Sequence, residues 1–405
     1  MKTSSLIART ILDSRGHWTV EAALTLRNGI RVTASVPQGK STGASEAHAL
    51  PAARAVRNIN KIIAPWLVRA DFNDQDALDA FLVRLDGTTS KSKLGANAIL
   101  ATSIAFARAS AAAKKVPLWR HLRTIAKLPA RKSAFAQPRL FINVVNGGLH
   151  AGNNLAFQEY LIIPKCRTIA ESVDVGTAVY HELGNALVAA KGKTAANLGD
   201  EGGYAPDFKD NLEPFAMLQH AAKKLKLDKK VDFGMDAAAT DIKDPALGRP
   251  GALMKAYAAI IKKYGPIYLE DPFDENDFEG FAGLNAEFNG EGGGTIWIAG
   301  DDLTTTNVRL MERAHAAKSV NAIIIKPNQI GSVSEALAAV RLAREYGWAV
   351  VASHRSGETN DDFIADFAYG VQADGLKLGA PARGERVAKY NRLLEIEEEG
   401  KKGGR

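Results

Sequence analysis

Residues 322–331 read AIIIKPNQIG, and this stretch decides how we expect the second part of the chain to fold. Three successive isoleucines without a polar residue between them predict a strand that is buried on both faces, as in a parallel sheet. Lys326 follows at once, so an ammonium group stands where the buried strand ends. Five other short apolar runs carry a titratable residue at or near their end: VDFGMD (231–236), PIYLED (266–271), TIWIAGDD (295–302), AVVASH (349–354) and GLKLG (375–379).

The segments between these runs have helical periodicity, as in GSVSEALAAVRLAREYG (331–347). Strands that alternate with helices predict an α/β fold with a parallel sheet covered on both faces. Successive run ends lie 23 to 34 residues apart, and one unit of a (β/α)8 barrel takes about 30 residues. Because the carboxyl ends of barrel strands open on one face, we expect six distant side chains to meet in one pocket: Asp236, Glu270, Asp301, Lys326, His354 and Lys377.

The first part of the chain has a different pattern. Three strands are predicted at 5–13, 17–26 and 30–36, and Asn28-Gly29 predicts a two-residue hairpin turn between the last two. Helical periodicity follows, which indicates a small α+β domain that we place at residues 1–126. A basic, proline-containing segment without periodicity then leads to the second domain, which we place at residues 138–405.

The composition is that of a soluble globular protein, with 46% hydrophobic and 24% charged residues among 405. The net charge is +7, but the basic residues are scattered and no aromatic-interleaved basic motif occurs, so nucleic-acid binding is not indicated. No apolar run is long enough to span a membrane. Cys166 is the only cysteine, and the first residues lack the apolar core of a secretory signal, so we expect a cytoplasmic protein.

Three of the strand-end residues, Asp236, Glu270 and Asp301, offer only oxygen ligands. This favours a hard cation, Mg²⁺ or Mn²⁺, over zinc. A set of structural salt bridges is the alternative, but carboxylates crowded without a cation would repel one another and raise their pKa values, so a metal is the simpler explanation. Beside a divalent cation, Lys326 is expected to have a depressed pKa and to serve as a general base.

Three further segments carry polar groups of the right kind for a site. GDEGG (199–203) contains Asp200 and Glu201, HAGNNLAFQE (150–159) contains His150, Gln158 and Glu159, and SHRSGET (353–359) contains Arg355 and Ser356, which together suit a phosphate. Each also has an ordinary interpretation: an acidic turn, a hydrogen-bonding loop histidine and a surface ion pair, respectively.

Taken together, these motifs resemble those of enolase, the phosphopyruvate hydratase family. The resemblance runs from about residue 4 to residue 398 and includes GDEGG, LEDPF (269–273), KPNQIGS (326–332) and SHRSGET in the family's order. It implies an amino-terminal domain of three strands and four helices, followed by a modified (β/α)8 barrel that opens with two strands and two helices. It further implies reversible dehydration of 2-phosphoglycerate to phosphoenolpyruvate with two Mg²⁺ ions, in a homodimer or octamer.

The resemblance also implies roles for individual residues. Lys326 takes the C2 proton, Glu201 protonates the departing C3 hydroxyl with Glu159 alongside, and His354 lies next to them. The substrate-binding residues are His150, Gln158, Glu159, Lys326, Arg355, Ser356 and Lys377. The metal ligands are Asp236, Glu270 and Asp301 for one ion, and Ser41 for a second ion that arrives with the substrate. Gln38 and Lys40 stand where the family leads us to expect small residues.

Other functions compete with this hypothesis. A phosphate-binding loop ending at Lys40 would need glycine at position 34, where Ala34 stands. A nucleophile elbow at Ser41 would leave the strand-end carboxylates unexplained. A sister enzyme of the same superfamily, such as an acid-sugar lyase or racemase, would not need the phosphate-type cluster at 353–356. A non-catalytic scaffold that binds RNA or protein partners, including at the cell surface, stays open.

Overall fold

A computed structural model describes residues 2–40, 43–129, 137–249, 251–290 and 296–402. Its amino-terminal part contains a three-stranded antiparallel sheet in the order β1 (Thr3–Leu12), β2 (Trp18–Leu26) and β3 (Arg31–Ser35). Alternate residues of β2, among them Val20, Ala22 and Leu24, are fully buried, because the pleat turns every second side chain toward the helices. The three predicted strands are therefore confirmed within one or two residues.

The hairpin between β2 and β3 differs from the predicted two-residue turn. Leu26 N donates to Ile30 O (2.8 Å) and Gly29 N donates to Leu26 O (3.0 Å), which encloses a three-residue loop. Only Gly29 has a positive φ, +87°. The Asn28 side chain instead accepts a hydrogen bond from Ile30 N, so this residue stabilises the loop without a left-handed backbone.

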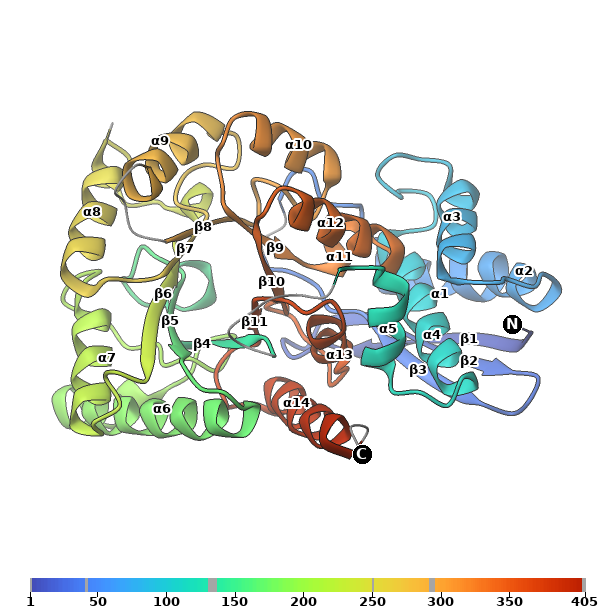
Figure 1. Ribbon diagram of the computed structural model, residues 1–405, viewed down its shortest axis with the longest axis horizontal. Coiled ribbons are helices and arrows are strands. Elements are labelled where there is room, and N and C mark those ends of the chain that lie inside the picture. Colours follow the sequence, from blue (N-terminus) through green and yellow to red (C-terminus); the bar gives the residue numbers. More distant parts are fainter. Residues whose placement is uncertain (1, 41–42, 130–136, 250, 291–295, 403–405) are drawn as a thin grey trace.

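Four helical segments lie on one side of this sheet (Figure 1), and the first and third of them pack directly on its strands. The first is continuous from α1 (Ala52–Asn58) through a π turn (Ile59–Ile63) into α2 (Ala64–Arg69). The others are α3 (Gln75–Asp86), α4 (Ala96–Ala113) and α5 (Leu118–Ala126). Helix α4 is alanine-rich and buried over almost its whole length, since it lies between the sheet and the neighbouring helices. This agrees with the predicted small α+β domain.

The second part is a closed eight-stranded barrel in the order β10-β11-β4-β5-β6-β7-β8-β9. Strands β4 and β5 pair antiparallel, as do β5 and β6, and the remaining neighbours are parallel. The six apolar runs predicted as strands form β6 to β11, and the two opening strands were expected only from the family resemblance. The bounds are β4 (Arg139–Asn146), β5 (Glu159–Pro164), β6 (Val231–Asp236), β7 (Tyr268–Glu270), β8 (Trp297–Gly300), β9 (Ala322–Ile325), β10 (Ala349–Ser353) and β11 (Gly375–Lys377).

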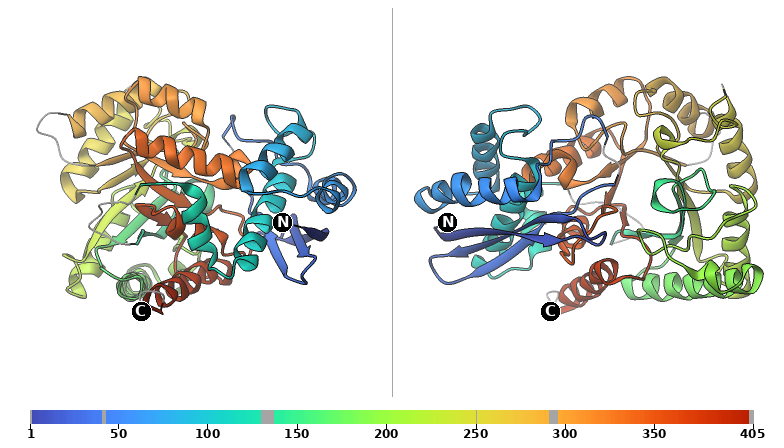
Figure 2. Two further views of the ribbon diagram at one scale, coloured as in Figure 1. Left: turned by 45° about the vertical axis from the view of Figure 1, so that its right-hand side comes forward. Right: turned by 180° about the vertical axis from the view of Figure 1, so that it is seen from behind.

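Helices surround the barrel on the outside (Figures 1 and 2). They are α6 (Ile169–Lys191), α7 (Glu213–Lys224), α8 (Ala252–Tyr264), α9 (Phe278–Asn289), α10 (Val308–Ala316), α11 (Pro327–Ile330), α12 (Val333–Glu345), α13 (Phe363–Gly370) and α14 (Gly384–Lys402). The predicted modified barrel with a small α+β domain before it is confirmed. None of the helices in the described ranges is long and apolar enough for a membrane span.

The amino-terminal domain packs on the segments that follow β9 and β10. Ala47 N donates to Gln329 O (2.7 Å), and Gln38 and Gly357 exchange two backbone hydrogen bonds (2.8 and 2.9 Å). Arg108 of α4 forms a bidentate pair with Asp361 (2.7 and 2.9 Å). These contacts hold residues 36–40 of the amino-terminal domain over the carboxyl ends of the barrel strands.

Candidate active site

The alternation of side chains along each barrel strand carries the titratable residues to the mouth of the barrel. In β9, Ile324 lies in the cluster that fills the barrel interior, whereas Ile323 and Ile325 pack outward in the main core. Lys326 comes two residues after Ile324, so its side chain points to the same, inner side of the barrel. Tyr268 and Ala299 occupy the same interior cluster, two residues before Glu270 and Asp301.

Lys377 lies at the centre of a buried group of carboxylates. Its Nζ is 2.6 Å from Glu270 Oε2, 3.0 Å from Glu159 Oε2 and 3.3 Å from Asp236 Oδ2. Although burial lowers the pKa of Lys377, these three carboxylates raise it well above its ordinary value. The side chain is therefore a permanent cation at the barrel mouth.

Lys326 is fixed by a closed ring of hydrogen bonds. Its Nζ pairs with Asp301, and its backbone N donates to Thr306 Oγ1 (2.9 Å). Thr306 donates to Gln329 Oε1 (2.8 Å), and Gln329 Nε2 donates to Asp301 Oδ1 (2.8 Å). Burial lowers the pKa of Lys326, but Asp301 and Glu270 raise it above its ordinary value in the metal-free protein, so the depressed pKa expected from the sequence is not a property of the protein alone.

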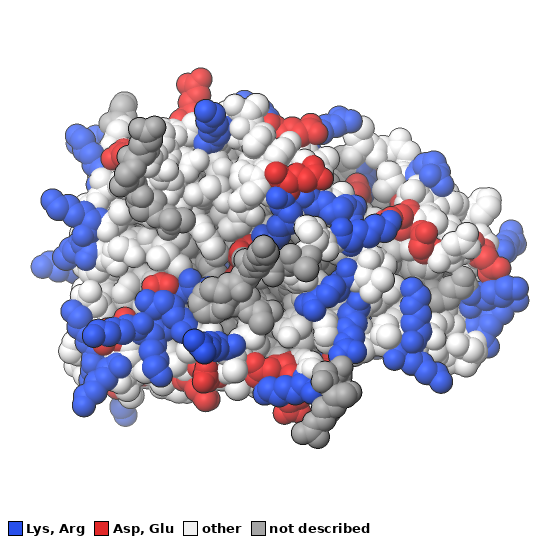
Figure 3. All heavy atoms as spheres, in the orientation of Figure 1, with Lys and Arg blue, Asp and Glu red and all other residues white. Residues whose placement is uncertain are grey.

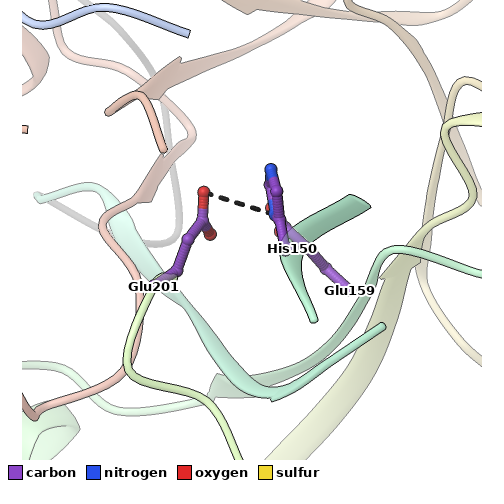
Figure 4. Close-up of side chains that lie close together, drawn as sticks. All are labelled: His150, Glu159 and Glu201. Carbon is purple, nitrogen blue, oxygen red and sulfur yellow. Dashed lines mark ion pairs between the residues drawn. The ribbon is translucent and has the colours of Figure 1, made fainter. Parts of the chain in front are cut away.

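His150, Glu159 and Glu201 form a second group, shown in Figure 4. His150 Nδ1 lies 3.6 Å from Glu159 Oε1 and 3.6 Å from Glu201 Oε1. Burial and the negative charge of Glu201 raise the pKa of Glu159 well above its ordinary value, and burial lowers that of His150. Burial alone would raise the pKa of Glu201, but His354 and His150 lower it well below its ordinary value. Glu159 therefore holds a proton next to an ionised Glu201 and a neutral histidine, an arrangement suited to moving a proton to or from a bound molecule.

The second carboxylate oxygen of Glu201, Oε2, is held by two hydrogen-bond donors. Asn143 Nδ2 donates to Oε2 (3.0 Å), and His354 Nε2 lies 3.2 Å from the same atom. Burial lowers the pKa of His354 to about 3, so the ring is neutral at physiological pH. Glu201 comes from the loop before α7 and His354 from the end of β10, so the fold joins two segments more than 150 residues apart.

The predicted phosphate contacts lie at the rim of the same pocket. Arg355 forms a bidentate pair with Glu46 (2.9 and 3.0 Å), and Ser356 Oγ accepts a hydrogen bond from Lys40 N (2.7 Å). Lys40 Nζ reaches Asp200 Oδ2 at 2.9 Å. Ser41, the predicted ligand of a second metal, lies outside the described residues.

The buried carboxylates at the barrel mouth have the properties that a divalent cation requires. Burial and Asp236 raise the pKa of Glu270 to about 8, and Glu270 Oε1 is buried without a hydrogen-bond partner in the described structure. A raised pKa is the expected result when carboxylates are crowded together without a cation. The expectation fails for Asp301, because the charge of Lys326 outweighs burial and lowers its pKa. An oxygen-only donor set with an unpartnered oxygen suits a hard cation.

Several neighbours of the site were not predicted from the sequence. Asp271 accepts from the backbone N of Asp301 (2.9 Å) and of Asp302 (2.8 Å), and these three carboxylates lie close enough together to hold an ion. The predicted trio of Asp236, Glu270 and Asp301 does not form so tight a group within the ranges that the structure covers. The doubled acids in LED and GDD were the signal that could have found Asp271 and Asp302.

One cavity of about 30 Å³ lies between these groups. The predicted residues on its wall are His150, Gln158, Glu159, Glu201, Asp236, Asp301, Lys326, His354, Arg355, Ser356 and Lys377. Glu270 is fully buried just beneath it. The basic surface residues are spread over the visible face (Figure 3), as the scattered charges of the sequence predict.

Comparisons with known proteins agree with this geometry. Residues 3–122 match the family model described as the enolase N-terminal domain, and residues 134–404 match the model described as the enolase C-terminal TIM barrel domain. The enolase of Solanum lycopersicum is 43% identical, covering 98% of this chain and 95% of that protein. The enolase of Methanocaldococcus jannaschii is 42% identical (97% and 94% covered), as is enolase 2 of Hevea brasiliensis (98% and 94%).

Proposed function

The chain belongs to the enolase family and catalyses the reversible dehydration of 2-phosphoglycerate to phosphoenolpyruvate, and on this premise we propose that Lys326 and Glu201 carry out its two proton transfers. The observation that supports this assignment most strongly is the shared cavity, whose wall carries both residues. Lys326 takes the proton from C2, and Glu201 gives a proton to the C3 hydroxyl as it leaves.

Lys326 is built as a base that must be released from its partner. It is largely buried, and burial disfavours its ammonium form, whereas Asp301 holds the proton in place. The ring through Thr306 and Gln329 fixes both the lysine backbone and the Asp301 carboxylate, so Nζ has one defined position at the strand end. A base held in this way is already positioned to react with the C2 proton, so little side-chain freedom is lost when the substrate binds.

Lys377 supports the charge that develops when the C2 proton leaves. Loss of this proton puts negative charge on C2 and on the adjacent carboxylate, which is already negative. The ammonium of Lys377 is buried, charged and surrounded by three carboxylates. A fixed cation in a site shielded from water stabilises such charge better than water does.

Glu201 and Glu159 supply the proton for the leaving hydroxyl. Oε2 of Glu201 is occupied by Asn143 and His354, so Oε1 is left on the side of His150 and Glu159. The raised pKa of Glu159 keeps a proton in this group at neutral pH. In the reverse direction the same carboxylates take a proton from water.

The phosphate is proposed to lie against Arg355 and Ser356, with Gln158 and His150 on the substrate side. Gln158 Oε1 is buried without a hydrogen-bond partner in the described structure. Arg355 already offers both guanidinium nitrogens in the fork that Glu46 occupies, and a phosphate is recognised by the same bidentate geometry. Ser41 stays a proposed ligand of the second metal.

The family relationship implies metal dependence, and we propose two Mg²⁺ ions per site. Asp236, Glu270 and Asp301 would hold one of them, since their oxygens are buried and Glu270 Oε1 has no other partner within the described ranges. When bound, Mg²⁺ supplies positive charge beside the substrate carboxylate and offsets the carboxylate charges that raise the pKa of Lys326.

Three further proposals complete this assignment. The domains divide at residues 126 and 138, the protein acts in the cytoplasm, and it forms a homodimer or octamer. Light scattering of the purified protein tests the oligomeric state, and limited proteolysis between residues 126 and 138 tests the domain boundary. These proposals stand apart from the reaction and do not decide it.

The decisive experiment measures phosphoenolpyruvate formation from 2-phosphoglycerate with added Mg²⁺. A chelator should abolish the product and fresh Mg²⁺ should restore it. Glycerate without the phosphate should not react, which separates this reaction from those of sister enzymes. Absence of product, together with specific RNA binding, would instead support the scaffold function.

A further inference from the structure

Arg386 is a fully buried cation whose guanidinium contacts residues 354–356 of the active site. It lies in the first turn of α14 and is 0% exposed. Its Nη1 lies 2.5 Å from His354 Nδ1 and 2.6 Å from Arg355 O, and its Nη2 lies 2.6 Å from Ser356 O. The nearest carboxylate oxygen, Glu385 Oε1, is 3.5 Å from Nε. Nη2 also donates to Asp200 O (3.3 Å), so the guanidinium hydrogen-bonds to one imidazole and three backbone carbonyls.

These contacts decide which ring nitrogen of His354 carries the proton. A guanidinium donates hydrogen bonds and cannot accept them, so His354 Nδ1 must be the acceptor. The proton of the neutral ring is then on Nε2, which lies 3.2 Å from Glu201 Oε2. His354 consequently donates to Glu201. A neutral ring is also what the burial of His354 and the adjacent charge of Arg386 favour.

We propose that Arg386 is a positioning residue for the dehydration step: it holds His354 as the Nε2-protonated tautomer, so that His354 fixes Oε2 of Glu201 and leaves Oε1 free to exchange the proton of the C3 hydroxyl. This proposal rests on the role assigned to Glu201 above. It concerns only one of the two proton transfers, because none of the contacts found for Arg386 in the described chain involves Lys326 or Lys377.

The tautomer can be read directly from the Mg²⁺-loaded enzyme. Protein labelled with ¹⁵N-histidine gives two-bond proton–nitrogen correlations that show which nitrogen of each ring is protonated, and loss of one pattern in His354→Gln assigns His354 among the eight histidines. We expect a neutral ring with its proton on Nε2 from pH 6 to 8. A ring protonated on Nδ1, or on both nitrogens at pH 7, would overturn the proposal.

Kinetics then test whether the tautomer matters for one step only. In Arg386→Met we expect a mixture of tautomers and a dehydration rate lowered roughly 10- to 100-fold, which is less than the roughly 10²- to 10⁴-fold lost when a general acid or base is removed outright. Exchange of the C2 proton with solvent should stay within about twofold of wild type, because Lys326 is untouched. Arg386→Lys, which keeps a cationic donor, should recover part of the dehydration rate.

A matched control separates positioning from general damage to α14. Arg392 lies on the same helix and pairs with Asp366 (2.7 and 2.9 Å), away from His354. Arg392→Met should lower thermal stability without changing the tautomer or the ratio of the two rates. If Arg386→Met lowered exchange and dehydration equally, or raised only the KM, its role would be structural.

The outcomes also distinguish this proposal from the assignment of the reaction. If Arg386→Met does not fold, the wild-type tautomer and Arg386→Lys still decide the question. If Glu201→Gln affected both steps equally, the assigned role of Glu201 would fail, yet the tautomer measurement would still report whether Arg386 directs His354.

Discussion

Lys377 Nζ lies 2.6 Å from Glu270 Oε2, although the two residues are 107 positions apart in the sequence. They stand at the ends of β11 and β7, which occupy opposite sides of the closed barrel. Tyr268 also donates to this Glu270 oxygen (2.5 Å). The pair therefore spans the barrel mouth and fixes the floor of the active site before any substrate arrives.

Lys377→Met should destabilise the metal-free protein strongly, because three buried carboxylates lose their shared cation. Breaking a buried ion pair costs about 3–5 kcal/mol. Mg²⁺ should restore more thermal stability to this variant than it adds to wild type, since it offsets the same charges. Thermal unfolding with Mg²⁺ and with chelator measures both effects.

Lys389→Met is the matched control for that experiment. Lys389 is equally buried and pairs with Glu358 (2.8 Å), but it does not line the cavity. The variant should be destabilised with no extra gain from Mg²⁺. An equal response of both variants to Mg²⁺ would show that the carboxylates around Lys377 do not hold the ion.

Lys326→Ala should abolish exchange of the C2 proton of 2-phosphoglycerate, because no other base in the described cavity replaces its Nζ. Loss of a general base lowers the rate by about 10²- to 10⁴-fold. Binding of Mg²⁺, measured calorimetrically, should stay nearly unchanged. Exchange that persisted in this variant would remove Lys326 as the base.

Glu201→Gln should leave C2 proton exchange active while blocking loss of the C3 hydroxyl, because the amide cannot supply a proton. We expect dehydration to fall by about 10²-fold or more. Deuterium exchange followed by mass spectrometry, next to the phosphoenolpyruvate assay, measures the two steps separately. An equal loss of both would mean that the two proton transfers are not divided between Lys326 and Glu201.

Lys40→Ala should lower kcat/KM by about two- to fivefold, because an exposed ion pair contributes roughly 0.2–1 kcal/mol. The pair with Asp200 (2.9 Å) ties residues 36–40 to the loop that carries Glu201. The effect should shrink at high salt. Asp200→Asn should lower kcat/KM by a similar factor, and the double variant should lower it little further. If the effects of the two substitutions on kcat/KM were fully additive, the two side chains would not act as a pair.

Asp79→Asn should change the pH dependence of stability between about pH 4 and 6. Burial raises the pKa of Asp79 from 3.8 to about 6, even though Ser103 and Ser334 donate to it. The folded protein thus binds this proton more tightly than the unfolded chain. The contribution of Asp79 to the free energy of unfolding is complete below about pH 4. It decreases by about 3 kcal/mol as the pH rises through 6.

Thermal unfolding of wild type and Asp79→Asn across this pH range measures the difference. Asp76→Asn serves as control, because Asp76 lies exposed on the same helix. The loss between about pH 4 and 6 should disappear only in Asp79→Asn. Parallel curves for all three proteins would show that Asp79 ionises normally in the folded state.

Much of the fold follows from local pattern. The run AIIIK predicted a strand buried on both faces, and the structure shows Ile324 inside the barrel with Ile323 and Ile325 outside. Helix α5 and strands β4 and β5 were not recognised from their own residues. These two strands are largely apolar runs, Arg139–Asn146 and Glu159–Pro164, with a polar loop between them. Neither run contains a residue pattern that predicts that the two strands pair antiparallel.

The sequence determined which residue types stand at the carboxyl ends of the strands, because the period of two and the buried runs are local properties. Only the tertiary structure decided who pairs with whom: Lys377 with Glu270, Lys326 with Asp301, Arg355 with Glu46 and Arg386 with His354. Charges separated by tens or hundreds of residues acquire partners only when barrel closure removes them from water. In that environment a nearby ion or donor sets each protonation state, which no single segment encodes.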